Sequence, residues 1–319
     1  GLVGSEMCIR DRFSELRNTH LVGGPRFHAS YTPARRPLTA IRLSGGYYYQ
    51  PPFYREMRGL DGFVRNDVAP QRAIHAVAGI EHEFESRNRP FKLVGELYRK
   101  GLDNLIPYEI ENVRQRYYAT NNSSGYATGL DVMVNGEFIQ GIQSWLRVSA
   151  LKTEEDLNDD QYLEYYNESG QQVIPGYHTG QFAVITDTVT VLPGMIPRPA
   201  DQRFSFSLVF QDEMPRDPDY KVLLSLYFGT GLPYGPPSSN RYDDVLRTPT
   251  YRRADIGFSR VLFGDEDSKR GLGSLEIFNL LGINNTINHN WIQDVNGRFY
   301  AVPNYLTGRR INLKVSLEF

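Results

Sequence analysis

The sequence predicts an all-β protein, an antiparallel transmembrane β-barrel, and three observations support this. Apolar and polar residues alternate along many runs, which is the period-two pattern of strands with one apolar and one polar face. Short and long connections alternate between these runs, as they do in membrane barrels. No run approaches the roughly 18 apolar residues of a membrane-spanning helix, and the chain contains 21 Tyr and 17 Phe. A helical membrane protein is thereby excluded.

Eleven strands are predicted. The clearest is 311–319, where apolar and polar residues alternate throughout and Phe319 ends the chain, as is typical of outer-membrane barrels. The first strand, at 21–31, is weaker, and the run at 275–281 is more evenly apolar. The other eight lie at 41–49, 74–84, 91–97, 126–134, 146–150, 204–210, 222–228 and 254–258. Several reach about nine residues, the length that a tilted strand needs to cross a bilayer.

The connections divide into two kinds. Short, turn-like ones lie at 32–37, 86–90, 136–141, 213–219 and 265–271, and long ones at 51–70, 108–124, 156–200, 229–249 and 283–308. Counting back from the last strand places every short turn on the periplasmic side and every long loop outside. A soluble sandwich or propeller fragment is the alternative, but its strands are usually about five or six residues. A propeller would also repeat every 40 to 50 residues or so, and no such repeat is found.

The composition adds little about partners but marks the N-terminus as unusual. The net charge of −2 gives no reason to expect nucleic-acid binding. The single cysteine, Cys8, lies in residues 1–12, which resemble translated sequencing-adapter DNA; an ordinary flexible N-terminus is the alternative. Setting this artefact aside leaves 13–319 as one barrel domain with no cysteine, which suits an exported protein. The sequence begins without a signal-peptide pattern, and we expect the true N-terminus to be missing.

Seven strings resemble one family. They lie at 46–56 (Gly-Tyr-Tyr-Tyr-Gln-Pro-Pro-Phe-Tyr-Arg-Glu), 93–107, 125–131, 196–203, 229–237, 276–282 and 305–319. In this order they resemble TonB-dependent outer-membrane receptors of the Bacteroidetes type, over essentially 13–319. Barrels of that family have about 22 strands and a plugged lumen. The resemblance therefore implies the C-terminal half of a receptor, about eleven strands, with the plug and the TonB-contacting box absent from this chain.

The resemblance also implies a function. The intact receptor would sit in the bacterial outer membrane, bind a scarce nutrient (siderophore, cobalamin, glycan or peptide) and import it with energy from the TonB complex, which acts on the plug. Outer-membrane lipid and the barrel-assembly machinery, which would read Phe319, are the other expected partners, and no cofactor is expected. A passive porin or an adhesin-like barrel is the alternative, and a barrel-embedded hydrolase ranks third.

Aromatic and arginine residues where strands meet long loops are the candidate ligand contacts, because they can stack on planar groups and donate charge-assisted hydrogen bonds. The first group is Tyr48, Gln50, Phe53, Tyr54 and Arg55, and the second is Tyr234, Arg241 and Tyr242. An interfacial aromatic girdle with loop packing is the plainer interpretation, and it is the one favoured for Trp145 and Trp291. Polar strand residues are expected to face the plug and water: Arg42, Lys92, Glu96, Arg203 and Arg253.

No enzyme signature is found. The sequence has no Gly-x-Ser-x-Gly, no His-Glu-x-x-His and no paired cysteines. His75 and His82 are separated by an odd number of residues, so they lie on opposite faces of one strand. The carboxylates of 154–160, with Glu164 and Glu168, could bind a hard cation. A solvated acidic loop is favoured, because no EF-hand spacing or turn glycine is present, and no metal site is predicted.

The terminal aromatic residue gives a first test. In the full-length receptor, Phe319→Ala is expected to reduce the amount of assembled barrel more than it changes ligand affinity. Surface labelling and ligand binding on the same cells measure the two effects. Normal surface levels of the variant would refute the assembly role.

Overall fold

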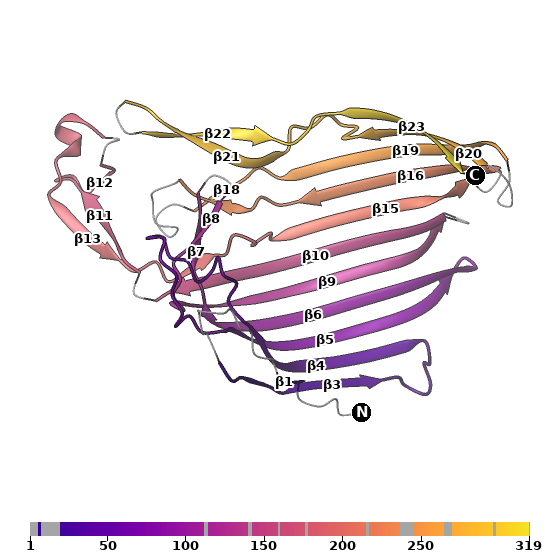
Figure 1. The fold of residues 1–319 in the computed structure, drawn as a ribbon, viewed down its shortest axis with the longest axis horizontal. Helices are drawn as coiled ribbons and strands as arrows, with labels where there is room; N and C mark the ends of the chain where they lie inside the picture. The colour runs from indigo at the N-terminus through magenta and orange to yellow at the C-terminus, as the bar shows by residue number, and fades with distance from the viewer. Residues whose placement is uncertain are drawn as a thin grey trace.

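The computed structural model describes residues 6–7, 20–111, 114–139, 142–158, 160–175, 178–214, 217–236, 245–264, 270–295 and 298–318. One large antiparallel sheet dominates it (Figure 1). In spatial order its strands are β3 (Arg26–Tyr31), β4 (Thr39–Gln50), β5 (Gln71–Ser86), β6 (Arg89–Leu105), β9 (Ser123–Ile139), β10 (Ile142–Leu157), β15 (Phe204–Met214), β16 (Asp217–Gly229), β19 (Tyr251–Phe263), β20 (Arg270–Phe278) and β23 (Arg310–Glu318). β14 (Met195–Pro197) adds to the end of β10.

All eleven predicted strands are confirmed, and their spatial order is their order along the chain. Several are longer than the alternation suggests: β6 and β9 have 17 residues each. Most of the extra length of β6 lies at the end with the long connections, because the two-residue turn at Arg87–Asn88 fixes its other end, whereas β9 extends beyond the predicted run at both ends. Both turn residues have positive φ, 54° and 58°, as a tight hairpin with the twist of its strands requires.

The pairing register brings the apolar sets of neighbouring strands onto one face of the sheet. Ile80 lies opposite Ile41 on one side and Gly95 on the other. The same continuity holds further along, where Leu275 lies between Phe258 and Leu313. A slip of one residue would move the apolar set of that strand to the polar face, so the agreement across the sheet fixes one register.

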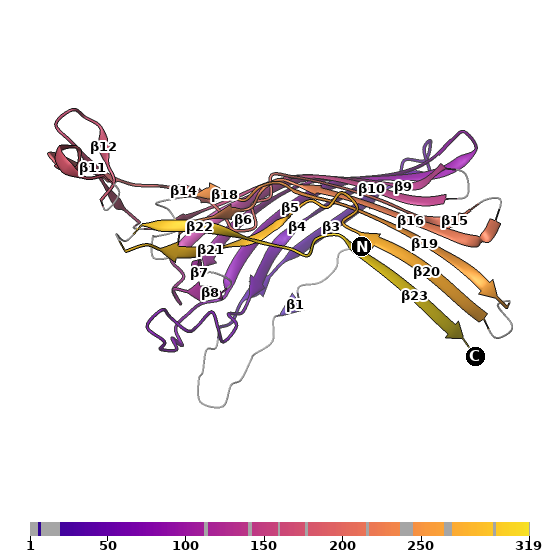
Figure 2. The ribbon, with the colours of Figure 1, turned by 90° about the horizontal axis from the view of Figure 1, so that it is seen from above.

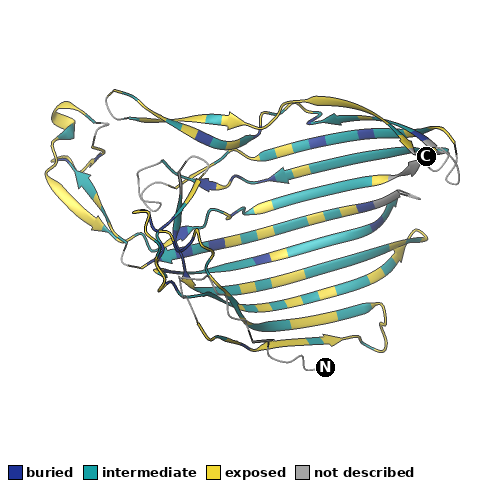
Figure 3. Ribbon diagram, viewed as in Figure 1, coloured by how far each residue is buried: buried dark blue, intermediate teal, exposed yellow. Residues whose placement is uncertain are grey.

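Exposed and half-buried residues alternate along strands such as β5 (Figure 3), and from Ile74 to Ile80 of β5 the exposed ones belong to the apolar face. Along β5, Ile74, Ala76 and Ile80 are exposed, whereas His75 and Val77 between them are half-buried. Leu313 of β23 has 76% of its surface exposed. In a protein surrounded by water, the apolar face would instead be buried against a second layer.

The polar face contains charge pairs. Glu81 accepts from Arg42 at 2.6 Å and pairs with Lys92. The Nε–H of Arg253 donates to both carboxylate oxygens of Asp255, at 2.8 and 2.9 Å. Of the residues expected on this face, Arg42, Lys92, Glu96 and Arg253 share it by the pairing register.

Two placements differ from expectation. Arg203 comes just before β15 and takes part in an ion-pair network near the long loops. Trp145 lies between Ser144 and Leu146, which pair with Phe210 and Leu208 and therefore point to the apolar face. Successive strand residues point to opposite faces, so Trp145 shares the polar face and does not belong to a lipid-facing girdle.

The long connections contain small sheets of their own. These are the hairpins β7 (Tyr108–Glu111) with β8 (Arg114–Tyr117), β17 (Pro233–Tyr234) with β18 (Leu246–Arg247), and β21 (Thr286–Gln293) with β22 (Phe299–Tyr305), and the three-stranded sheet of β11 (Tyr162–Tyr166), β12 (Gln172–Val173) and β13 (Asp187–Val191). A 3₁₀ turn, Gly180–Ala183, precedes β13. All gather at the end opposite the short turns, and β11–β13 project furthest from the main sheet (Figure 1).

Seen from above, the sheet is a curved shell rather than a closed barrel (Figure 2). Its two edges are β3 and β23, and neither edge has a further partner strand among the described residues. Near the N-terminus, the two-residue strands β1 (Glu6–Met7) and β2 (Gly23–Gly24) pair with each other. In the part of the chain that the structure describes, no helix is long and apolar enough to span a membrane.

The open edges determine how this chain should behave by itself. Unpaired N–H and C=O groups along β3 and β23 cannot be satisfied in lipid, so the isolated chain is expected to aggregate or fail to insert. Size-exclusion chromatography and limited proteolysis in detergent would measure this. A monodisperse, protease-resistant barrel would contradict it.

Candidate ligand-binding site

A cavity among the described residues lies at the long-loop end of the sheet. Its volume is about 530 Å³. Its walls come from strand ends of β16 and β19, from the connections that follow β10 and β16, and from the hairpins β7–β8 and β21–β22. The lining residues are Glu109, Pro197, Pro199, Gln202, Tyr227, Thr230, Leu232, Pro233, Tyr234, Gly235, Pro236, Val245, Thr248, Pro249, Tyr251, Thr286, Ile287, Asn288, His289 and Trp291. Ligand pockets of proteins commonly have volumes of about 300–1,000 Å³.

Aromatic rings form much of the wall. The Tyr234 ring stacks on His289, with centroids 4.1 Å apart and planes 10° apart, and Trp291 lies 6.1 Å from Tyr234. Tyr227 and Tyr251 meet edge to face at 5.3 Å. The last two belong to the polar face of neighbouring strands, so alternation alone places them inside. The pocket therefore has flat apolar surfaces on more than one side.

Two buried polar atoms in this wall lack a hydrogen-bond partner among the described residues: Nδ1 of His289 and Oδ1 of Asn288. His289 is only 8% exposed, and burial lowers the pKa of its imidazole, because a charged ring is poorly solvated there. The ring is therefore neutral at pH 7. An unsatisfied buried polar atom is costly, so a ligand group that reached either atom would gain a hydrogen bond.

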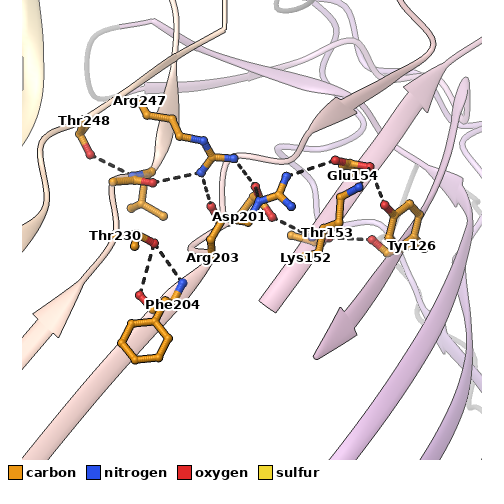
Figure 4. A network of polar contacts seen from close by, with 12 residues as sticks. Tyr126, Lys152, Thr153, Glu154, Asp201, Arg203, Phe204, Thr230, Arg247 and Thr248 are labelled. Carbon is orange, nitrogen blue, oxygen red and sulfur yellow. Dashed lines mark hydrogen bonds and ion pairs between the residues drawn. The ribbon is translucent and has the colours of Figure 1, made fainter. Parts of the chain in front are cut away.

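A buried carboxylate fixes the loops around the pocket (Figure 4). Asp201 is fully buried; it accepts from the Thr153 backbone N–H at 2.8 Å and from Arg203 Nε at 2.7 Å, and it also pairs with Arg247. Arg247 in turn donates to the carbonyl oxygens of Asp201 at 2.8 Å and Gly231 at 3.1 Å. One side chain thus joins strand β10, the start of β15 and the β16–β19 loop.

The acidic run was expected to be a solvated loop, and this is wrong for its first residues. Glu154 and Glu155 belong to β10, which continues to Leu157. Glu154 pairs with Lys152 at 3.0 Å and with Arg203 at 3.2 Å, and buried Glu155 pairs with Arg198 at 3.0 Å. Their charges are thus used within the loop scaffold. Across the described residues, no group of three or more His, Cys, Asp or Glu is arranged to bind a metal ion.

The first predicted group of ligand contacts is divided between two environments. Tyr48 lies on the polar face, where its ring stacks on His75 at 4.2 Å and the Arg26 guanidinium lies 4.4 Å from its centroid. His82 faces the other way and bonds Thr39 at 2.8 Å, which confirms the expected opposite faces. Gln50 ends β4 and is exposed.

The rest of that group lies in the β4–β5 loop. Phe53 and Tyr54 are exposed, and Arg55 lies 5.9 Å from the ring of Tyr117. The loop packs on the β6–β9 connection through a small core that includes Met57 and Tyr117. None of the five residues of this group lines the pocket, and whether they contact a ligand stays a prediction.

Of the second predicted group, Tyr234 lines the pocket, whereas Arg241 and Tyr242 lie outside the described residues, as does Phe319. The sequence interpretation missed His289 and Asn288 as pocket residues and treated Trp291 as packing or girdle. It also gave Asp201 no role beyond the string 196–203. A polar or aromatic residue in a long loop offers no periodic signal, so only the fold reveals which loops meet.

No model of a known protein family matches the chain, and no curated protein matches its sequence. Solved structures match the fold. The outer membrane transporter YddB from Escherichia coli aligns with a TM-score of 0.59 and 12% identity over 94% of this chain and 41% of that one. The ferric-catecholate import receptor Fiu from K12 E. coli aligns with a TM-score of 0.57 and 14% identity over 93% of this chain and 35% of that one. The FrpB iron transporter from Neisseria meningitidis aligns with a TM-score of 0.55 and 12% identity over 93% of this chain and 39% of that one.

These matches define a class. The chain has the fold of the C-terminal part of a TonB-dependent outer-membrane receptor barrel. It spans 35–41% of the length of the three solved proteins named above. By name these three proteins are transporters and receptors.

Removing the central carboxylate should loosen the loops at the pocket. In Asp201→Ala, the Thr153 amide loses its acceptor and two guanidinium groups lose a shared partner, so amide exchange in the peptides that contain Thr153 and Gly231 is expected to accelerate at least about tenfold. Hydrogen exchange with mass spectrometry on the full-length protein in lipid nanodiscs measures this.

Asp61→Ala is the matched control. Asp61 pairs with Arg65 at 2.9 Å, but both side chains are nearly half exposed, and such pairs contribute about 0–1 kcal/mol. Its effect should be confined to its own loop. Equal effects of the two substitutions at Thr153 would contradict the role given to Asp201.

Proposed function

We propose that this chain forms part of the barrel of an outer-membrane receptor that takes up a scarce nutrient with energy from the TonB complex. The observation that supports this best is the exposed apolar face of the sheet. A continuous apolar band on eleven strands suits contact with the hydrocarbon of a bilayer, and the charged and aromatic face suits a watery, plugged lumen. The fold match to outer-membrane transporters points to the same membrane.

The position of the pocket supports the direction of uptake. It lies at the long-loop end, which faces outward when the short turns are periplasmic. The polar face beneath it continues along the strands, through residues such as Tyr48, Glu81 and Asp255. A nutrient captured among the loops would therefore lie above the space that a plug fills.

The partners follow from this proposal. The plug would contact the polar face, the TonB complex would act through the plug, the barrel-assembly machinery would handle the C-terminal strand, and lipid would cover the apolar face. The seven strings that resemble the family, taken in their order along the chain, are the basis for proposing the Bacteroidetes type. Residues 1–12 are proposed to be foreign to the natural protein.

A second function is a passive porin or an adhesin-like barrel, since both would also expose an apolar face. Several loops line the pocket with aromatic residues. This favours binding of a ligand over its free diffusion through the barrel, because an open porin channel needs no aromatic binding wall.

Energy dependence separates these functions. The full-length protein is expressed in cells grown on the nutrient that induces it. These cells are expected to stop taking up that nutrient when a protonophore collapses the proton-motive force or when TonB is deleted. Radiolabelled uptake, with binding to de-energised cells as the control, measures this. Unchanged uptake would indicate a porin, and binding without any uptake would indicate an adhesin.

A further inference from the structure

The charge of the pocket restricts what it can bind. Among its described lining residues, Glu109 is the one with a formal charge at pH 7, since burial keeps His289 neutral. Arg116, on the paired strand of the same hairpin, lies 3.9 Å from the Glu109 carboxylate. Arg247 is next to the lining in sequence, but Asp201 and Gly231 already bind its guanidinium. An anionic ligand would therefore find no lining cation there.

The backbone of the wall is poor in donors as well. Five of the lining residues are prolines: Pro197, Pro199, Pro233, Pro236 and Pro249. Proline has no N–H, whereas sites that bind anions without lysine or arginine usually do so through successive backbone N–H groups. Proline rings also restrict the backbone, so a pocket built from them loses less conformational entropy when a ligand binds.

The shape of the remaining wall favours a ring. Tyr227, Tyr234, Tyr251 and Trp291 present flat π surfaces, and aromatic groups gain about 0.5–1.5 kcal/mol from such contacts beyond burial alone. The buried Oδ1 of Asn288 accepts hydrogen bonds only, and Nδ1 of His289 accepts them when the proton is on Nε2. A ligand N–H or O–H that reached either atom would satisfy it.

We infer that this pocket accepts a ligand without negative charge that has a flat, largely apolar ring system and at least one N–H or O–H group at its edge. The inference rests on the proposed function and names the chemical class of ligand that the pocket selects. Anionic chelates are disfavoured here, because they would give up hydration without a cation among the described lining residues, whereas the aromatic faces and the Glu109 carboxylate can accommodate a cation.

Three indole derivatives of nearly equal shape test the charge preference. They are indole-3-acetamide, which is uncharged, indole-3-acetate, which is anionic, and tryptamine, which is cationic. Titration calorimetry on the full-length protein in nanodiscs is expected to show both the amide and tryptamine binding at least about tenfold more tightly than the acetate. Empty nanodiscs correct for partition into lipid. Binding of the acetate as tight as or tighter than that of the amide or of tryptamine, or no binding of the amide, would overturn the inference.

Variants locate the binding. Tyr234→Ala is expected to weaken binding of the amide at least about tenfold, because it removes a central stacking surface. Tyr300→Ala is the matched control: it truncates an exposed tyrosine of the same β21–β22 hairpin that lies outside the lining, and affinity should stay within about twofold. Equal losses in the two variants would place the binding elsewhere.

A new cation should reverse the preference. Ile287 lines the pocket and is 58% exposed, so Ile287→Lys can place an ammonium at the rim without breaking a packed core. The ratio of acetate to amide affinity is expected to rise at least about fivefold at low salt and to fall back at high salt. An unchanged ratio would contradict the electrostatic basis of the selection.

These binding measurements need neither TonB nor a proton gradient. If the amide preference is found and uptake survives a protonophore, the uptake mechanism is wrong and the inference stands. If uptake depends on energy but the acetate binds best, the ligand class alone is wrong.

Discussion

The structure depends on one constraint: each backbone N–H and C=O of the sheet must find its partner on the neighbouring strand, because the apolar face provides none. Eleven strands meet this by pairing with their neighbours in sequence, all antiparallel. Lateral pairing leaves side chains free to divide strictly into two sets, since successive residues point to opposite faces. Everything that distinguishes the two faces follows from that division.

The division explains why two kinds of stabilisation coexist. On one face Ile80, Leu97 and Leu313 are exposed in register, which is stable where hydrocarbon replaces water. On the other, Glu81 and Asp255 pair with arginine or lysine across or along the strands. The short turns, such as Arg87–Asn88, set the register at one end. The opposite end is consequently free to extend into hairpins and loops.

Those loops acquire a defined arrangement through a few polar side chains. Asp201 joins three segments that are far apart in sequence, and Asn121 does the same for two others by bonding the backbone of Ala69 at 2.6 and 2.9 Å. Because charged and amide groups meet these backbone atoms, the loops need only a small apolar core around Met57 and Tyr117. The aromatic pocket is built on this scaffold. Glu109 is the one formally charged residue among its described lining residues, and the nearby charges of Asp201 and Arg247 are paired with each other.

The sequence by itself determined the strands, their order and their faces, because a period of two over long runs is a local property that pairing then preserves. It also placed Tyr234 among the ligand candidates and His75 and His82 on opposite faces. Only the tertiary structure decided that Glu154 and Glu155 belong to a strand, that Trp145 shares the polar face, and that His289 and Trp291 meet Tyr234. Contacts between separate loops depend on how the strands position their ends, and no periodic pattern in either loop encodes them.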